Sequence, residues 1–509
     1  MTRKLFWIFF FLILIISFAI RLYPTFGYNF YFTVDQGNNA VQVRDLIEKG
    51  VLPLKGPETG ISGVFTGPLW YYFVAIGHKL FNGDPFGGLL MVILLNISAT
   101  ALVMWVLYKK ISWKVSLLVG ASLQAFWHYY DFSRYEFNPF PLIFLSFWQI
   151  FLLTGFLEGK KRNYVLAFIP LFLSFNSEVA GSVALLLFQG VVGLYAVYKK
   201  TFSLKEYLLK AVAISGILAL PLLFLLYRQF VKSSLVSSDV SPERGYFSST
   251  NFTEMLMNFS DIFEHSIIPQ SLVASIFVLT IAVCFYLKAK KKLTFEKNFF
   301  FLVILLWVVS YLFFGSNHGW QDWHTIYLYP LTFVSIILLL TQIPRKFGAI
   351  FLAIILFSQL FLFKERYVEY LKPSNDYSML YNRLDVIDWI YENREGQGFN
   401  VYTFTSHIYD YPSQYLFWWY GRKEYGFMPC EYSVEPGFLK HMYISGAEFY
   451  SQPTLGCETF RFAVIEPGNL QPKKVTALEK LRSDTILIEE KQVGGVTVEK
   501  RRVKREEEL

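Results

Sequence analysis

The sequence has few cysteines and few charged residues for its length. Only 3 of the 509 residues are Cys, and no Cys-x-x-Cys pair or Cys/His cluster is present that would hold a structural metal. Charged residues make up 17% of the chain, against 54% hydrophobic and 19% aromatic residues. A soluble globular protein is usually more charged and less apolar. The composition gives little support to a zinc or redox protein and indicates an integral membrane protein.

Basic residues exceed acidic ones, which gives a formal net charge of +8. The Lys and Arg residues lie in short groups between apolar segments, as they do in the cytoplasmic loops of membrane proteins. A nucleic-acid-binding protein gathers its basic residues into a continuous face or tail instead. We therefore expect membrane lipid, and no nucleic acid, among the partners of this chain.

Long apolar segments recur along most of the chain. The opening MTRKLFWIFFFLILIISFAI has a basic lead and no small-residue cleavage site after its apolar run, so we expect a retained signal anchor. Each later segment approaches the ~20 residues that a helix needs to cross hydrocarbon about 30 Å thick. They fall near residues 86–108, 113–129, 139–157, 163–177, 179–198, 206–228, 267–287, 297–314, 325–343 and 347–363. The sequence predicts a polytopic α-helical protein with roughly eleven transmembrane helices.

Residues 67–83, GPLWYYFVAIGHKLFNG, are too short to add another span, because their apolar part would rise only ~21 Å as a helix. If they lie on the membrane surface, every basic connection falls on the side of the amino terminus. These connections contain Lys109, Lys110, Lys114, Lys160, Lys161, Arg162, Lys199, Lys200, Lys205, Lys288, Lys290, Lys291, Lys292, Arg345 and Lys346. We therefore predict a multi-pass protein of the cytoplasmic membrane, with its amino terminus in the cytoplasm and its carboxyl terminus outside.

The composition changes near residue 364, which divides the chain into a membrane-embedded domain at 1–363 and a soluble α/β domain at 364–509. LDVIDWIYE is typical of a helix, FNVYTFT of a buried strand, and the alternating runs around Gly494-Gly495 of a hairpin. Cys430 and Cys457 both fall in this domain. An oxidising compartment would allow them to pair, but their spacing does not establish the bond.

The first external loop contains VDQGNNAVQVRDLIEKG, in which Asp35 precedes a run with apolar residues at helical spacing. A carboxylate beside apolar surroundings is costly unless it is stabilised or used. Asp35 is therefore either a residue that caps the start of the helix or a functional carboxylate on the outer face.

Two further external loops carry polar residues next to a predicted span. HYYDFSRYEFNPFP at 128–141 supplies Asp131, Arg134, Glu136 and Asn138, and GSNHGWQDWHTIYLYP at 315–330 supplies His318, Asp322, His324 and Tyr327. The first loop is also compatible with an ordinary turn before a helix that starts near Pro139. The second is also compatible with the aromatic belt at a membrane surface. The concentration of charge in the first loop favours a functional role.

Asp35-Gln36-Gly37, with the Pro-containing turn Gly67-Pro68-Leu69-Trp70 that follows, resembles the first external loop of C-superfamily (GT-C) glycosyltransferases. This superfamily includes the protein O-mannosyltransferases and the aminoarabinose transferases that modify lipid A. The resemblance covers residues 1–363 in span order. It implies a polyprenyl-phosphate sugar donor, a hydroxyl-bearing acceptor and interfacial helices in the first external loop. Many members have a Lys before the Pro, whereas this chain has Thr66-Gly67-Pro68.

The resemblance implies that Asp35 is the general base of an inverting transfer. Arg134 is then the first candidate to neutralise the departing phosphate, followed by His324. Other substrate-binding candidates are Asp131, Glu136, Asn138, Asp322, Tyr327 and Lys55. The carboxylates among them would orient Arg134 or bind sugar hydroxyls. The role of the missing Lys either passes to Lys55, Lys79 or Arg134 or is absent from this chain. No cofactor is required, although shared carboxylates are compatible with a divalent metal.

Two other classes of protein remain compatible with the sequence. A lipid or glycan transporter would carry charges near the middle of its spans, where only Asn176, Glu178 and Gln189 approach such positions. A non-catalytic surface protein would bind glycans through its C-terminal domain. The aromatic run YLFWWYG at 415–421 suits such contacts, but it also suits core packing.

Overall fold

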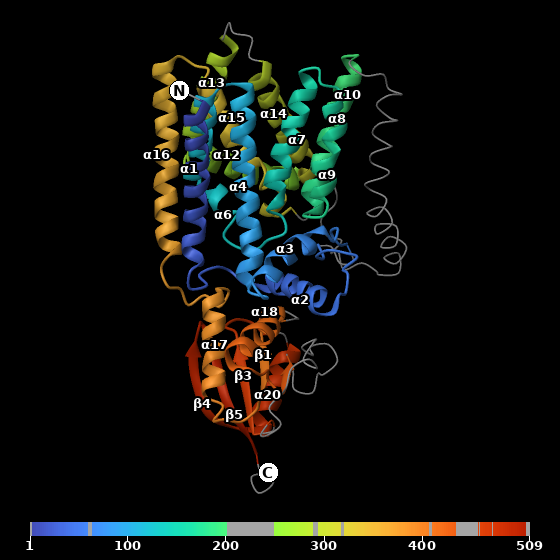
Figure 1. Cartoon of the computed structure of the whole chain (residues 1–509), viewed down its shortest axis with the longest axis vertical. Coiled ribbons are helices and arrows are strands. Elements are labelled where there is room, and N and C mark those ends of the chain that lie inside the picture. Colours follow the sequence, from blue (N-terminus) through green and yellow to red (C-terminus); the bar gives the residue numbers. More distant parts are fainter. Residues whose placement is uncertain are drawn as a thin grey trace.

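The structure is a computed structural model in which a long helical bundle continues into a smaller region built around a sheet (Figure 1). It describes residues 3–59, 64–200, 249–288, 294–316, 320–406, 410–433, 457, 459–470 and 472–504. The predicted span at 206–228 and His318 lie outside these residues.

Most elements of the described chain are helices, and the strands fall only after residue 398. The helices are α1 (Arg3–Leu22), η1 (Tyr23–Thr25), α2 (Val34–Lys49), α3 (Leu69–Leu80), α4 (Pro85–Lys110), α5 (Trp113–Ala125), α6 (Trp127–Asp131), α7 (Pro141–Leu157), α8 (Arg162–Leu166), α9 (Phe168–Ser174), α10 (Val179–Tyr198), α12 (Ser249–Ile267), α13 (Leu272–Lys288), α14 (Thr294–Gly315), η2 (Asp322–Thr325), α15 (Leu328–Leu340), α16 (Arg345–Tyr370), α17 (Leu380–Glu392), α18 (Tyr411–Leu416), η3 (Phe417–Gly421), α19 (Arg422–Tyr425) and α20 (Pro472–Asp484). The strands are β1 (Phe399–Phe404), β2 (Glu431–Ser433), β3 (Phe460–Ile465), β4 (Thr485–Val493) and β5 (Val496–Val503).

Six helices of the described residues are long and apolar enough to cross a membrane, or up to seven if one bent pair counts as a single span. The predicted number of about eleven is therefore not confirmed, although the polytopic helical class is. The span predicted at 267–287 corresponds to α13. This helix is bent by 68° from the preceding α12, and the two together are long and apolar enough for one broken span. The predicted span at 163–177 is divided between the two short helices α8 and α9.

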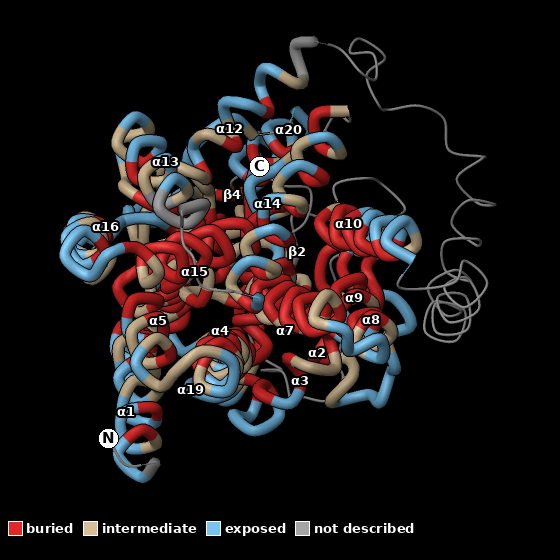
Figure 2. Tube along the Cα trace, turned by 90° about the horizontal axis from the view of Figure 1, so that it is seen from above, coloured by how far each residue is buried: buried red, intermediate tan, exposed pale blue. Residues whose placement is uncertain are grey.

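Burial differs strongly between the helices of the bundle. Every residue of α15 is buried, and Figure 2 shows this helix surrounded by others. Only 22% of the most apolar stretch of α16 is buried, and this helix lies at the edge of the bundle (Figure 2). An exposed apolar surface of this kind is what a lipid-facing helix presents, whereas a helix that is apolar all round is expected in the core.

The two ends of the bundle carry different elements. At one end, Phe6 near the start of α1 stacks on Tyr108 near the end of α4, with 4.1 Å between ring centroids. At the same end, Lys110 pairs with Glu158 after α7. The basic connections at 109–114 and 158–162 therefore share this end, which is the pattern that the charge argument predicted. At the other end lie α2, α3 and the sheet region (Figure 1).

Helix α3, predicted over 67–83, has only 12 residues and begins and ends at the same end of the bundle. The backbone N–H of Gly67 donates to the carbonyl of Phe175 at 3.0 Å. Near the other end of α3, a Cβ on Gly77 would lie 2.9 Å from Met91 Cγ in α4. These two glycine contacts hold α3 against the ends of longer helices.

The sheet region has five strands in the order β2-β1-β3-β5-β4. Strand β1 is parallel to β2 and β3, and β5 is antiparallel to β3 and β4. The strand predicted at FNVYTFT is β1, the helix predicted at LDVIDWIYE is the end of α17, and Gly494 and Gly495 form the turn between β4 and β5. Both glycines have positive φ, of 53° and 84°, as such a turn requires.

The sheet region and the first external loop share one hydrophobic cluster. Phe30, Phe32 and Val41 from the loop and α2 pack in the same cluster as Tyr415 and Trp418. The backbone also joins the two parts, because Phe32 N–H donates to Ser378 O at 2.7 Å. The boundary predicted at residue 363 stays a prediction, and α16 itself continues to Tyr370.

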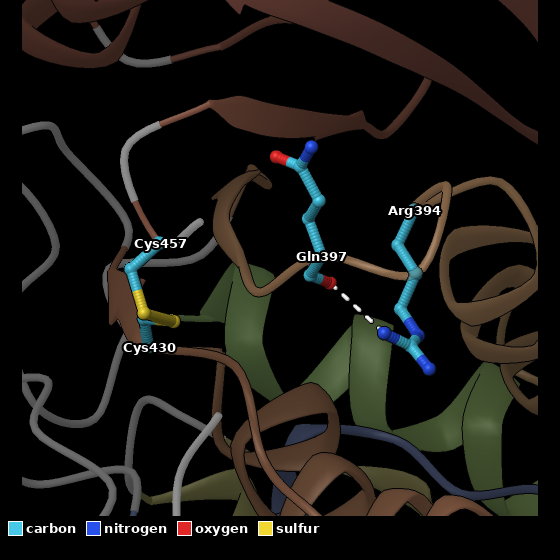
Figure 3. Close-up of a disulfide and its surroundings, with 4 residues drawn as sticks. All are labelled: Arg394, Gln397, Cys430 and Cys457. Carbon is cyan, nitrogen blue, oxygen red and sulfur yellow. Dashed lines mark hydrogen bonds between the residues drawn. A yellow bond between two sulfur atoms is a disulfide. The ribbon is translucent and has the colours of Figure 1, made fainter. Parts of the chain in front are cut away.

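Cys430 and Cys457 form a disulfide, which the sequence had left open. Their Cα atoms are 5.7 Å apart and 27 positions separate them in the chain. Figure 3 shows the bond near the turn that precedes β1, where Arg394 Nη1 donates to the carbonyl of Gln397 at 3.1 Å. The bond joins the start of β2 to the approach to β3.

Candidate active site

Asp35 lies in the first turn of α2 and is exposed. The N-cap residue of the helix is Thr33, whose N–H and hydroxyl both donate to Gln36 Oε1, at 2.8 and 2.6 Å. A carboxylate in the first turn is favoured there by the partial positive charge of the helix start. Asp35 is thus a first-turn residue of α2 that also lines a cavity.

This cavity has a volume of about 350 Å³ and lies between α2, the turn before α3, the loop before α7 and the start of α10. It brings together three residues singled out from the sequence, which are Asp35, Asn138 and His324. It adds two further carboxylates, Glu58 and Glu178. The cavity is thus rich in hydrogen-bond acceptors, as a site for a polyhydroxylated ligand would be.

Glu178 is the residue of this cavity that was noticed in the sequence without being assigned a role. It caps α10 by accepting a hydrogen bond from Ala180 N–H at 2.8 Å, and another from Gly181 N–H. Burial raises the pKa of Glu178 to about 7, although the backbone N–H groups of Gly181, Ala180 and Val179 oppose the shift. An acidic residue directly before a 20-residue apolar helix is the signal that could have found it.

His324 faces Glu178, with its Nε2 3.7 Å from Glu178 Oε1. The backbone N–H of Gln321 donates to His324 Nδ1 at 3.2 Å, so that nitrogen carries no proton. The imidazole is therefore neutral and presents Nε2–H to the cavity. His324 supplies a hydrogen-bond donor here rather than the cation considered from the sequence.

Asp131 and Arg134 line a different cavity, of about 700 Å³, between α6, α12, α16 and the linker that follows α16. Asp131 orients Arg134 by accepting from its Nε. The guanidinium carbon lies 4.3 Å from the ring centroid of Tyr370 and 5.5 Å from that of Tyr31. The sequence grouped Arg134 with Asp35 in one cavity, but the structure divides them between two.

Tyr135 lies close to charged groups that line each of the two cavities. Burial raises the pKa of the Tyr135 hydroxyl, and the nearby charges of Asp131 and Asp35 raise it further, so groups lining both cavities act on one side chain. Tyr31, in the wall of the larger cavity, packs edge-on against Tyr135 with 5.7 Å between centroids.

The remaining predicted residues line neither cavity. Glu136 is buried and accepts hydrogen bonds within the protein, and the hydroxyl of buried Tyr327 bonds to Ser310 at 3.1 Å. Asp322 is exposed at the start of η2. The ammonium group of Lys55 lies 3.6 Å from the ring centroid of Phe65. Their assignment as groups that contact substrate has no support from these positions.

Two other expectations can be compared with the described residues. No group of three or more His, Cys, Asp or Glu side chains in them is placed to hold a metal ion, and we assign no metal ligand. In the aromatic run at 415–421, the side chains from Tyr415 through Trp419 are buried. These rings form part of the core and do not offer a face to a glycan.

Comparison with solved structures identifies the fold. No protein-family model and no curated protein matches the sequence. The crystal structure of ArnT from Cupriavidus metallidurans bound to undecaprenyl phosphate matches over 98% of both chains, with a TM-score of 0.59 and 9% identity. The apo form of the same protein gives 0.59 and 10% over 98% of both chains. The chain therefore has the fold of ArnT, and the resemblance to GT-C enzymes is confirmed at the level of the fold.

A more distant match is the archaeal oligosaccharyltransferase AglB from Archaeoglobus fulgidus, in complex with an inhibitory peptide and a dolichol-phosphate. It has a TM-score of 0.49 and 13% identity over 77% of this chain and 59% of its own.

Proposed function

We propose that this protein is an inverting glycosyltransferase that moves a sugar from a polyprenyl phosphate to a hydroxyl acceptor. The observation that carries the proposal is Asp35, an exposed carboxylate at the start of α2 that lines a polar cavity at one end of the bundle. The ArnT structure that shares this fold holds undecaprenyl phosphate, which supports a lipid-phosphate donor for this chain.

In the proposed reaction, the Asp35 carboxylate takes the proton of the acceptor hydroxyl as its oxygen attacks the anomeric carbon. The bond from that carbon to the phosphate oxygen breaks, and its electron pair leaves with the polyprenyl phosphate. A positioned base typically contributes ~10²–10⁴ in rate to such a step. Glu58, Glu178 and the Nε2–H of His324 lie around the same cavity and suit the hydroxyls of the sugar.

The departing phosphate gains negative charge and needs a donor with a fixed orientation. We propose Arg134 for this role. Asp131 engages its Nε, which leaves the two terminal nitrogens to face an anion in the fork geometry that suits phosphate. In this proposal, a donor would place its phosphate in the larger cavity, beside Arg134, and its sugar in the smaller one, beside Asp35.

We also propose that this reaction takes place on the outer face of the cytoplasmic membrane. The basic connections at 109–114 and 158–162 lie at the opposite end of the bundle from both cavities, and basic loops are retained on the cytoplasmic side. The Cys430–Cys457 disulfide supports an oxidising compartment for the sheet region.

The proposal is tested by incubating the purified protein, in lipid, with a panel of polyprenyl-phosphate hexoses and measuring sugar release. We expect the wild type to consume one donor. Asp35→Asn should bind that donor with similar affinity and release its sugar at least about a hundredfold more slowly, because an amide cannot accept the proton. Glu48→Gln, a neutralised carboxylate at the far end of the same helix, is the matched control.

Arg134→Lys tests the phosphate site separately. Lysine keeps the charge but loses the fork, so we expect weaker donor binding with Asp35 still functional. Wild-type release by Asp35→Asn would contradict the assignment of Asp35 as the base. No release from any donor by the wild type would contradict the enzyme proposal and favour a transporter or a glycan-binding surface protein. Unchanged donor binding by Arg134→Lys would contradict only the proposal that Arg134 binds the donor phosphate.

A further inference from the structure

A chain of buried polar side chains connects the sheet region to the helix that carries Asp35. Its members come from four different elements and are all buried. They are Tyr415 in α18, His78 in α3, Glu136 in the loop before α7, and Asn39 and Gln36 in α2. A buried polar network is favourable only if its members satisfy one another, because each unpaired group keeps its desolvation cost.

The first link crosses from the sheet region to α3. The Tyr415 hydroxyl donates its single proton to Gly83 O, 2.5 Å away, and also lies 3.2 Å from His78 Nδ1. Because its proton is already used, the Tyr415 oxygen must accept, so His78 carries a proton on Nδ1. His78 Nε2 is 3.2 Å from Glu136 Oε2, and this second bond requires one proton between the two atoms.

The second link runs from Glu136 to the first turns of α2. Asn39 Nδ2 donates to Glu136 Oε1 at 3.1 Å, and Gln36 Nε2 donates to the Glu136 carbonyl at 2.5 Å. Gln36 follows Asp35 in the sequence, and Asn39 lies one helical turn after it. The loop that carries Glu136 therefore holds α2 on both sides of the position from which Asp35 projects.

Helix α4 leaves space for this network at Gly88. A Cβ on Gly88 would lie 2.7 Å from His78 Nε2 and 2.8 Å from Glu136 Cδ, so any larger residue would displace the pair. An ionised or proton-sharing pair at such depth costs free energy unless its geometry is held on every side. Here backbone and side-chain groups from α2, α3 and α18 hold it.

We propose that this relay is a positioning device: through Tyr415, His78 and Glu136, the sheet region fixes the orientation of α2 and hence of Asp35. The inference depends on the proposed function only where it predicts an effect on turnover. Tyr415, His78 and Glu136 are then positioning residues that do not contact substrate.

The test uses the full-length protein and a readout that needs no donor. In a Cys284→Ser background, Asp35→Cys provides one reactive thiol in the cavity, and its rate of modification by a neutral methanethiosulfonate reagent reports the orientation of α2. We expect Tyr415→Phe and Glu136→Ala to change this rate at least threefold. Tyr420→Phe, in the same aromatic run but bonded to Asp388 instead, should leave it unchanged.

A conservative variant separates positioning from direct chemistry. In Glu136→Gln, the side-chain carbonyl still accepts from Asn39 and the amide donates to His78 Nε2, so every partner stays satisfied. We expect Glu136→Gln, in the chain with native Asp35, to keep at least half of the wild-type kcat for a consumed polyprenyl-phosphate hexose. Glu136→Ala should lose about tenfold or more in kcat with KM within twofold.

Three results would overturn the proposal or restrict it. An unchanged modification rate of the Asp35→Cys thiol in both Tyr415→Phe and Glu136→Ala would show that the relay does not orient α2. Loss of turnover in Glu136→Gln as large as in Glu136→Ala would show that the carboxylate acts directly. If Asp35→Asn keeps wild-type turnover, Asp35 is not the base, and if the wild type consumes no donor, the proposed function fails; in both cases the thiol modification rates still decide the positioning role.

Discussion

Gly37 lies directly against Pro412, so that a Cβ on Gly37 would be 2.6 Å from Pro412 Cδ and 2.7 Å from the carbonyl carbon of Tyr411. The sheet region thus contacts α2 two residues after Asp35. Two of the three atoms closest to that Cβ belong to backbone, which cannot rotate away. This contact explains why a glycine stands near the start of an otherwise ordinary helix.

Gly37→Ala should therefore destabilise the protein. In an isolated helix, Ala is more favourable than Gly by about 1 kcal/mol. Here we expect the opposite sign, with a loss of about 1–3 kcal/mol for the forced separation of α2 and α18. Thermal unfolding in detergent and limited proteolysis between α16 and β1 measure it. Gln42→Ala, at an exposed position of the same helix, is the control, and an equal or higher Tm for Gly37→Ala would refute the contact.

The sequence predicted the parts of the site that depend on local pattern. Asp35 stood out because a carboxylate follows an apolar span, and the start of α2 followed from helical spacing. The division of Asp35 and Arg134 between two cavities could not be predicted, because it depends on how α6, α12 and α16 pack. For the same reason, the sequence alone could not show whether the run 415–421 binds a sugar or packs in the core. The structure places this run in one hydrophobic cluster with Phe30 and Val41.

The disulfide predicts a defined pattern of thiol reactivity. Cys284 is the one free cysteine, because Cys430 and Cys457 are bonded. Under denaturing conditions, a maleimide should therefore add once to the unreduced protein and three times after reduction. Loss of the bond should lower the unfolding free energy by about 2–4 kcal/mol, since it no longer restrains the unfolded chain. Mass spectrometry and Tm values of Cys430→Ser/Cys457→Ser test both statements, and three additions before reduction would disprove the bond.

The raised pKa of Glu178 predicts a pH-dependent stability. Its pKa is about 7 in the folded protein and 4.5 for the ordinary group, so the folded state binds the proton more tightly. The stability that neutral Glu178 contributes is therefore fully present below pH 4.5 and is lost as the pH rises toward 7. We expect the Tm of the wild type, relative to that of Glu178→Gln, to fall between about pH 5 and 8 by an amount on the order of several degrees.

Glu48→Gln serves as the control for that comparison, because Glu48 is an exposed carboxylate with no place in either cavity. Its Tm should follow the wild-type curve at every pH. Parallel curves for the wild type and Glu178→Gln would mean that Glu178 is ionised in the folded protein across this range, because the backbone N–H groups around it outweigh its burial.

The proposed orientation predicts which exposed positions a membrane-impermeant maleimide can reach in intact cells. Lys160 lies in the basic connection after α7, and Glu479 is exposed on α20 of the sheet region. In a Cys284→Ser background, Glu479→Cys should be labelled in intact cells, whereas Lys160→Cys should be labelled only after the membrane is permeabilised. The reverse pattern would place both cavities on the cytoplasmic side. Labelling of both positions in intact cells would mean that the basic connections do not lie across the membrane from the sheet region.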